Sequence, residues 1–196
     1  METYPSNLYD WRLIPETALA AATNGKVFVD NLGEFTEIRK KLSEYFPEDI
    51  RLNKIATRCM KIAQSGQYNF PRCMKRDEIV AARMAETEFI DEAVHMIYLL
   101  NRVYKPFYKW FHRRLKELPI LGEEIHVMIG KLVKFPFDET YRKVEIIEKI
   151  CANIITEMKR QGVIEVIKSD FLLDYGPEIQ ASIKDEKLRN WSPWLD

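Results

Sequence analysis

The sequence lacks the short motifs that mark the common nucleotide-binding and hydrolytic enzymes. Its seven glycines form no P-loop, no GxGxxG pattern and no GxSxG pattern. The first two motifs bind phosphates through backbone N–H groups, and the third exposes a nucleophilic serine at a sharp turn. Without these motifs, the sequence gives no support to the familiar phosphate-binding loops or to serine hydrolases of that type.

Cysteine is scarce, and neither sign of charge is in excess. Cys59, Cys73 and Cys151 are odd in number, lie far apart and form no CxxC pair, which is typical of reduced thiols in the cytoplasm. Thirty basic and thirty acidic residues cancel, so the chain as a whole has no electrostatic attraction to nucleic acid or anionic lipid. There is no signal-peptide pattern, and no run approaches the roughly 20 apolar residues of a membrane span. We therefore expect a cytoplasmic protein that is not embedded in a membrane.

Strand patterns are nearly absent, whereas apolar residues recur at helical spacing along most of the chain. "KVFVD" (26–30) could form one short strand, but it has no partner with which to build a sheet. We expect an all-α protein with one domain over 1–196, a multi-helix bundle with an irregular N-terminal segment (1–32) that packs on it. The predicted helices cover 49–66, 77–105, 107–118, 121–133 and 138–162, with a last helical piece over 170–185.

The predicted helix over 77–105 is the longest and should be central. Its second half, "VHMIYLLNRVY", is apolar nearly all round, which favours a helix with neighbours on several sides. Asp138 is a good N-cap for the helix that ends at Gly162.

The segment "QSGQYNFPRCMKR" (64–76) is the first candidate site. Gly66 should end the preceding helix, because glycine readily adopts the left-handed conformation of a C-cap. Amide side chains and cations then precede the N-terminus of the long helix, where free N–H groups favour an anion. The pattern fits a nucleobase or phosphate site, and it equally fits a solvated turn whose amides cap two helices.

A basic stripe is the second candidate. Arg102, Lys109, Arg113 and Lys116 recur at helical spacing and could hold phosphates, or could simply form a solvated face. The same spacing directs Trp110 towards the core, together with Phe111, Leu115 and Leu118.

Two Glu-x-x-His pairs are the third candidate. Glu92 and His95, and again Glu123 and His126, have the ligand spacing of di-iron four-helix proteins. That centre also needs an inward glutamate from each of two further helices, and the apolar pattern supplies none. The set is incomplete, so we expect no metal ligands.

The stretch "KIAQSGQYNFPRCMKR", followed by "LLNRVYKPFYKW", resembles a bacterial family of unknown function. Its domain usually follows a nucleotidyltransferase core, of the superfamily that includes the kanamycin and lincosamide nucleotidyltransferases. The likeness extends upstream through "LAAATNGKVFVDNLGEFTEIRKKLSEYFPEDI" and downstream into "IKDEKLRNWSPWL".

The resemblance implies a C-terminal helical domain that binds substrate or nucleotide. The core's Gly-Ser turn and Asp-x-Asp pair do not occur here, so the chain should not be catalytic by itself. Mg²⁺ and a nucleoside triphosphate are expected only together with a core, as part of a longer protein or as a separate partner. The surface left by a missing core could also support a homodimer.

The resemblance also suggests which residues would face the nucleotide or the acceptor. Glu88 and Asp91 share a polar stripe with His95 and are the candidates for a general base. The expected binding residues are Gln67, Tyr68, Asn69, Arg72, Arg76, Asn101, Arg102, Lys109 and Trp110. The alternatives to this function are a helical protein-interaction module that is the partner of a separate nucleotidyltransferase and, last, a di-iron helical bundle.

Overall fold

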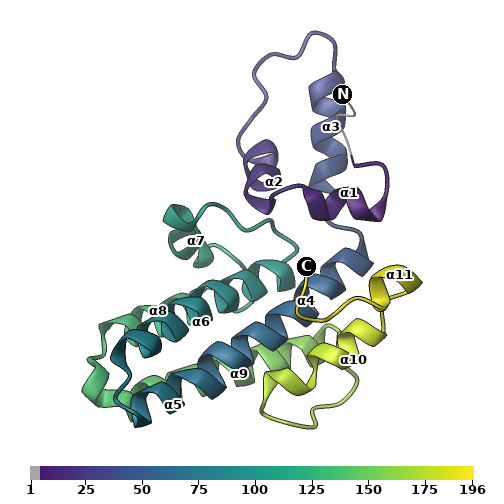
Figure 1. Ribbon diagram of the computed structural model, residues 1–196. Coiled ribbons are helices and arrows are strands. Elements are labelled where there is room, and N and C mark those ends of the chain that lie inside the picture. The colour runs from purple at the N-terminus through teal and green to yellow at the C-terminus, as the bar shows by residue number, and fades with distance from the viewer. Residues whose placement is uncertain (1–4) are drawn as a thin grey trace.

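The computed structural model describes residues 5–196, and within that range it contains helices and no strand. The expected all-α fold is therefore confirmed. Figure 1 shows a bundle of long helices with a smaller arm, built from the first three helices, standing on one end. The arm comprises α1 (Leu8–Leu13), α2 (Glu16–Thr23) and α3 (Glu34–Ser43). The bundle comprises α4 (Glu48–Ile62), η1 (Ala63–Asn69), α5 (Phe70–Lys75), α6 (Ile79–Leu100), α7 (Tyr108–Leu115), α8 (Gly122–Lys134), η2 (Phe137–Glu139), α9 (Thr140–Arg160), η3 (Leu172–Asp174), α10 (Gly176–Ala181) and α11 (Glu186–Arg189).

The helix that was expected to stop at Gly66 continues, so that prediction is wrong. α4 runs through the π-helical turn η1 into α5 as one rod. Gly66 is buried inside the rod, and a Cβ added to it would lie 2.2 Å from the ring of Phe89 on α6. The glycine is thus required for close helix packing rather than for a left-handed cap. The wide turn lies just before Pro71, which has no N–H to donate to the helix.

α6 is the central helix, as predicted, but it ends at Leu100 rather than at Lys105. Arg102 adopts the left-handed conformation, with φ of 53°. The Arg102 and Val103 N–H groups donate to the carbonyls of Leu99 and Tyr98, the paired bonds of a Schellman ending. The chain therefore leaves the helix before Pro106 and turns towards α7.

The N-terminal segment is more regular than expected, since two helices form within residues 8–23. Asn7 caps α1, and the Asp10 side chain accepts from the Asn7 N–H in a reciprocal capping box. Pro15 then precedes the alanine-rich α2. Residues 26–30 contain no strand.

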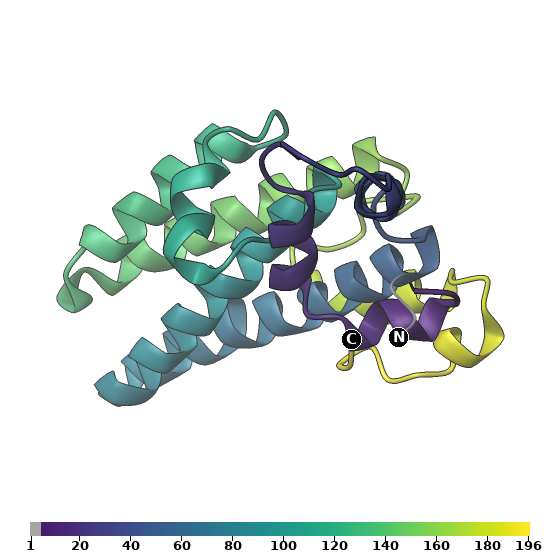
Figure 2. The ribbon, with the colours of Figure 1, turned by 90° about the horizontal axis from the view of Figure 1, so that it is seen from above.

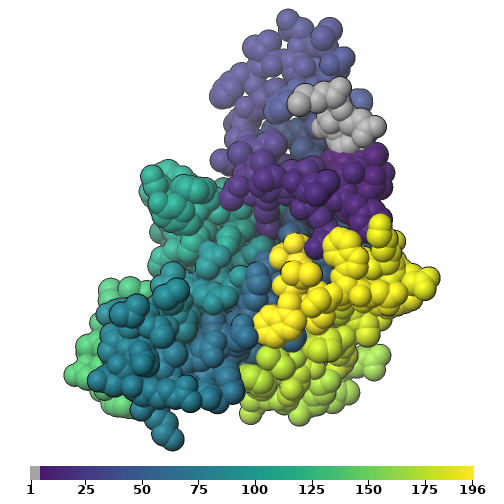
Figure 3. All heavy atoms as spheres, viewed as in Figure 1, coloured from purple at the N-terminus to yellow at the C-terminus, as the bar shows by residue number. Residues whose placement is uncertain are grey.

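Aromatic side chains fix the arm to the bundle. Phe46 packs edge-on against both Trp11 and Tyr104, with ring centroids 5.8 Å and 4.9 Å apart. The Tyr104 hydroxyl donates to the carbonyl of Leu42 on α3. In the same region α2 lies beside the segment that joins α6 to α7, which Figure 2 shows from above. Figure 3 shows the remainder of the arm projecting from the compact bundle.

The helices of the C-terminal half follow the predicted pattern through α9, whereas the last helical piece expected over 170–185 divides into the short η3 and α10. α9 begins after a short 3-10 turn that contains Asp138, with Glu139 rather than Asp138 at its N-cap, and it ends with Gly162 at φ of 70°. Among residues 5–196 no helix is long and apolar enough to cross a membrane.

Candidate functional site

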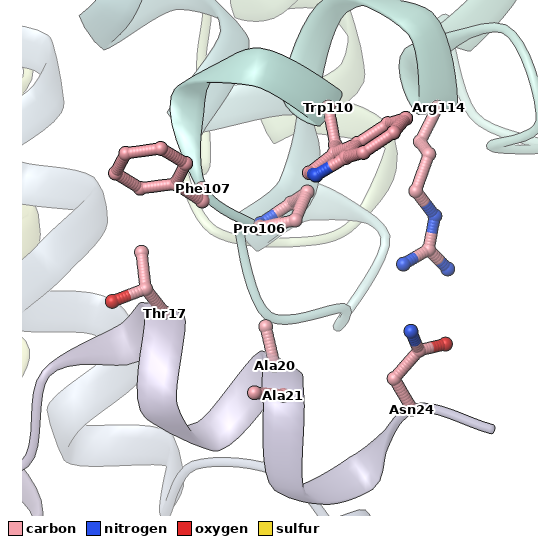
Figure 4. A pocket seen from close by; sticks show the side chains of 8 residues that line it. All are labelled: Thr17, Ala20, Ala21, Asn24, Pro106, Phe107, Trp110 and Arg114. Atoms are coloured by element: carbon pink, nitrogen blue, oxygen red, sulfur yellow. The ribbon is translucent and has the colours of Figure 1, made fainter.

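A groove of about 660 Å³ lies between α2 and the start of α7. Its volume falls within the range of roughly 300–1,000 Å³ that is usual for small-molecule sites. Figure 4 shows small side chains from α2 on one side and aromatic side chains on the other. The lining residues are Thr17, Ala20, Ala21, Asn24, Pro106, Phe107, Trp110 and Arg114.

One face of α7 supplies the aromatic and basic part of this lining. Trp110 and Arg114 are four residues apart on α7 and therefore lie on one side of the helix, and Phe107 precedes them as the N-cap. Phe107 and Trp110 are 51% and 52% exposed, so their rings are open to a ligand. The prediction that Trp110 points into the core is therefore wrong, whereas Leu115 of the same helix is fully buried.

A smaller chamber of about 140 Å³ adjoins the groove. The two spaces share Ala20, Asn24 and Arg114, so the guanidinium group lies where they meet. The nearest carboxylate partner of Arg114 is Glu117, at a long 3.8 Å on the exposed surface. Such a contact contributes little, and the Arg114 guanidinium remains available to an anion.

Glu16 connects the two walls of the groove. One oxygen of its carboxylate accepts the backbone N–H of Lys105 at 2.7 Å, and the other accepts from Nε2 of His95 at 2.7 Å. Glu16 begins α2, and Lys105 lies just before Pro106. A single carboxylate therefore ties the start of α2 to the segment that leads into α7.

The His95 ring lies between a carboxylate and a guanidinium. Its Nδ1 is 2.6 Å from Nη1 of Arg58, and because a guanidinium can only donate, Nδ1 must accept. The proton then resides on Nε2 and is donated to Glu16. Burial lowers the pKa of His95, the charges of Arg58 and Lys105 lower it further, and Glu16 opposes both.

Arg58 extends this arrangement into a buried network of charges. Its Nε lies 2.5 Å from Glu92 and its Nη2 lies 2.9 Å from Asp196. Burial alone would raise the pKa of Asp196, but the charges of Arg58 and Lys54 hold it well below its usual range. Likewise, the pKa of Glu16 is lowered by His95 and Lys54 in spite of its burial. The network therefore favours the ionised forms of Glu16 and Asp196.

A family model described as a domain of unknown function (DUF4037) matches residues 11–111, just over half of the chain. The chain belongs to this family. No curated protein and no solved structure matches it.

The DUF4037 match contains both walls of the groove up to Phe111, together with the Glu16, Arg58 and His95 network. Arg114 lies three residues beyond the match, on the same helix as Trp110. The groove is therefore mainly a feature of the matched region, with its cation added from the next turn of α7.

The predicted residues of the η1 junction lie at the end of the rod that points away from the arm (Figure 1). Gln67 donates to the Glu148 carboxylate and the Asp170 carbonyl, and it accepts the N–H of Leu172. Through these contacts Gln67 links η1 to α9 and to η3 with the residues just before it. The exposed Arg72 guanidinium donates to the Tyr68 hydroxyl at 2.6 Å and lies over its ring. The partly buried Asn69 and the exposed Arg76 complete this set.

The remaining predicted binding residues are dispersed. The Asn101 side chain bonds to the carbonyls of Ile97 and Ile120 and to the Ile120 N–H, which joins α6 to the start of α8. Arg102 pairs with Glu48 at 2.8 Å, and Lys109 is exposed. Of the nine predicted binding residues, Trp110 is the one that lines the groove.

The two predicted carboxylates on α6 do not converge on the groove lining. Glu88 is exposed, and Asp91 pairs with Nζ of Lys105 at 2.8 Å. Both remain candidates for a general base only by the resemblance.

The two histidines of the Glu-x-x-His pairs make contacts other than metal coordination. His95 belongs to the Glu16 network, and His126 stacks on His112 with ring centroids 4.1 Å apart. Each of the two stacked rings is bonded to the other's backbone carbonyl. Within residues 5–196, no three His, Cys, Asp or Glu side chains gather as a metal site would require.

Sequence reasoning missed Thr17, Asn24, Phe107 and Arg114. The spacing of Trp110 and Arg114 could have indicated one shared face of α7. The α2 residues carry no such signal, because alanines and a threonine at those positions look like an ordinary helix surface.

Proposed function

We propose that this DUF4037 protein is the helical substrate-binding domain of a nucleotidyltransferase-like protein and binds a nucleotide in the groove between α2 and α7. The observation that carries the proposal is the placement of the half-exposed Trp110 ring beside the available guanidinium of Arg114. An indole face stacks on a base, and a guanidinium is a strong donor to phosphate. The Asn24 amide both donates and accepts, so it can bond the base or the sugar.

The domain would not transfer a nucleotide alone. The chain has no Asp-x-Asp pair and no Gly-Ser turn, the parts that in the resembled superfamily hold magnesium and the triphosphate. A core, joined in the same protein or supplied as a separate cytoplasmic partner, would provide Mg²⁺ and the second half of the site. The acceptor substrate would then meet the nucleotide between the two halves.

Isothermal calorimetry with nucleotides tests this proposal on the full chain. We expect binding that Trp110→Leu weakens by about tenfold, since stacking on an aromatic side chain contributes roughly 1–3 kcal/mol per base. Arg72→Ala is the matched control for the distant η1 junction and should leave the affinity unchanged. Weakening by Arg72→Ala but not by Trp110→Leu would move the site to the junction, and no binding at all would contradict the proposal.

A protein-interaction module is the second candidate, because the arm exposes large apolar side chains. Phe28 and Leu32 are 92% and 82% exposed in the loop between α2 and α3. Exposed apolar surface of this kind marks contact with another protein or a second copy of the chain. Sedimentation measurements on the wild type and on Phe28→Ser/Leu32→Ser test self-association. Dimerisation that the double variant abolishes would favour this function.

A further inference from the structure

The groove contains a single charged side chain. Among its lining residues in the described part of the chain, Arg114 is the one cation, and no carboxylate is present. The adjoining chamber adds Thr23, Val103 and Tyr104, which are neutral. The walls therefore offer charge complementarity to one anionic group.

The other cations near the groove are engaged or lie on another face. The guanidinium of Arg39 donates to the carbonyls of Thr23 and Gly25 at the end of α2. Lys105 is paired with Asp91. Lys109 is exposed on α7 one residue before Trp110, which turns it about 100° away from the groove face. Arg113 is exposed as well, and its guanidinium carbon lies 6.0 Å from the centre of the Trp110 ring, so it interacts with an aromatic side chain of the lining.

The polar groups also lie at different ends of the groove. Figure 4 shows the Arg114 guanidinium facing the Asn24 amide at one end, with the Phe107 ring and Thr17 towards the other. Trp110 lies between these ends. A ligand that fills the groove would place its ring against Trp110 and Phe107 and its anion between Arg114 and Asn24.

From this arrangement we infer that the groove recognises a ligand with one planar ring and one anionic group, a nucleoside monophosphate, and gains little further affinity from the added phosphates of the corresponding triphosphate. The inference rests on the proposed nucleotide site and names its ligand class. A triphosphate needs several cations, or a metal ion held by carboxylates, to balance its charge. The groove lining offers one arginine and no carboxylate, so the additional phosphates would gain no partner within it.

Calorimetric titration of the full chain with AMP, GMP, CMP and UMP, and with the matching nucleosides and triphosphates, tests the inference. For the nucleotide that binds best, we expect the monophosphate to bind about ten- to a hundredfold tighter than the nucleoside, the effect of one charge-assisted hydrogen-bonded contact. The triphosphate should bind no more than about threefold tighter than the monophosphate, with or without Mg²⁺.

Two variants assign the effect to Arg114. Arg114→Gln should remove the preference for monophosphate over nucleoside and leave nucleoside affinity within about twofold. Lys116→Gln removes the same unit of charge two residues farther along the chain, at an exposed position, and should change neither affinity. These comparisons separate a local contact from a general attraction to basic surface.

The outcomes separate the inference from the proposed function. A triphosphate that binds tenfold tighter than the monophosphate, or that requires Mg²⁺, would overturn the single-anion inference while leaving nucleotide binding intact. A monophosphate preference that survives Arg114→Gln would overturn the role of this groove. Absence of binding for every nucleoside and nucleotide would overturn both.

Discussion

At the scale of single residues, Gly66 shows how one missing side chain permits a helix contact. A Cβ at this position would lie 2.2 Å from the Phe89 ring, and both residues are buried. We expect Gly66→Ala to lower the free energy of unfolding by about 1–3 kcal/mol, the usual effect of overpacking a core. Urea unfolding measures this change.

Gly130 provides the matched control for that substitution. It lies inside α8, where an added Cβ would meet nothing within 4 Å. Gly130→Ala should raise the free energy of unfolding by about 0.5–1 kcal/mol, because alanine loses less backbone entropy in a helix. Equal effects of the two substitutions would contradict close packing at Gly66.

His95 predicts a pH dependence of stability. Burial lowers its pKa in the folded protein, while the unfolded chain keeps a value of about 6.5. The unfolded state therefore binds more protons below that pH, and stability falls as the pH drops from about 7. We expect His95→Gln to flatten this dependence between about pH 7.5 and 5.5, measured by thermal unfolding.

The pKa of His112 is also lowered by burial, so His112→Gln should remove a separate part of the slope. A slope unchanged in His95→Gln would contradict a neutral imidazole between Arg58 and Glu16.

At the scale of elements, the sequence predicts most helices because apolar spacing and end signals agree. α9 ends at Arg160, with the expected Gly162 two residues beyond it at positive φ, and α8 begins one residue from its expected start. The failures have local causes that spacing does not express. Gly66 is compatible with both a C-cap and a tight helix crossing, and its use depends on where Phe89 lies. Arg102 ends α6 in the left-handed conformation, which is uncommon for non-glycine residues, so the sequence does not predict this helix end.

The candidate site was harder to predict than the helices, because it combines segments that are distant in sequence. Glu16 of α2 bonds to the backbone of Lys105, 89 positions along the chain and just before α7. Of the predicted residues, Trp110 lines the groove, while Gln67 and Asn101 use their amides to join helices. Amide side chains near helix ends suit both roles, and only their surroundings distinguish them.

Asn101 gives the prediction at the scale of elements. Its side chain makes two bonds to backbone groups of Ile120 and one to the carbonyl of Ile97, so it holds the loop before α8 against the end of α6. Asn101→Ala should lower the free energy of unfolding by about 1–3 kcal/mol, since it leaves partly buried backbone groups without partners. Chemical denaturation checks the value. Lys109→Ala, at a nearby exposed position, should change stability by less than about 0.5 kcal/mol.

At the scale of the whole molecule, the arm and the bundle are joined by aromatic packing and by the buried Glu16 network. The aromatic contacts involve α1, α3 and the chain around Tyr104, whereas α2 is tied to the bundle through Glu16. The two kinds of contact can therefore be separated by mutation. Loss of the Glu16 carboxylate should loosen the start of α2, while the bonds from Arg39 of α3 to the carbonyls of Thr23 and Gly25 keep the end of α2 on the arm.

We expect Glu16→Ala to lower the free energy of unfolding by at most about 1.5–3 kcal/mol for each charge-assisted bond that is lost. The loss of local stability should differ between parts of the chain. Amides of α2 should exchange hydrogen faster in the variant, because opening of that helix no longer breaks the bonds to His95 and Lys105. Amides in the buried second half of α6 should keep their relative protection, since their helix bonds and packing remain. Hydrogen exchange resolved by peptide measures this pattern. Faster exchange that is uniform over arm and bundle would mean that Glu16 stabilises the fold as a whole, whereas exchange confined to α2 would identify it as the residue that holds the groove's movable wall.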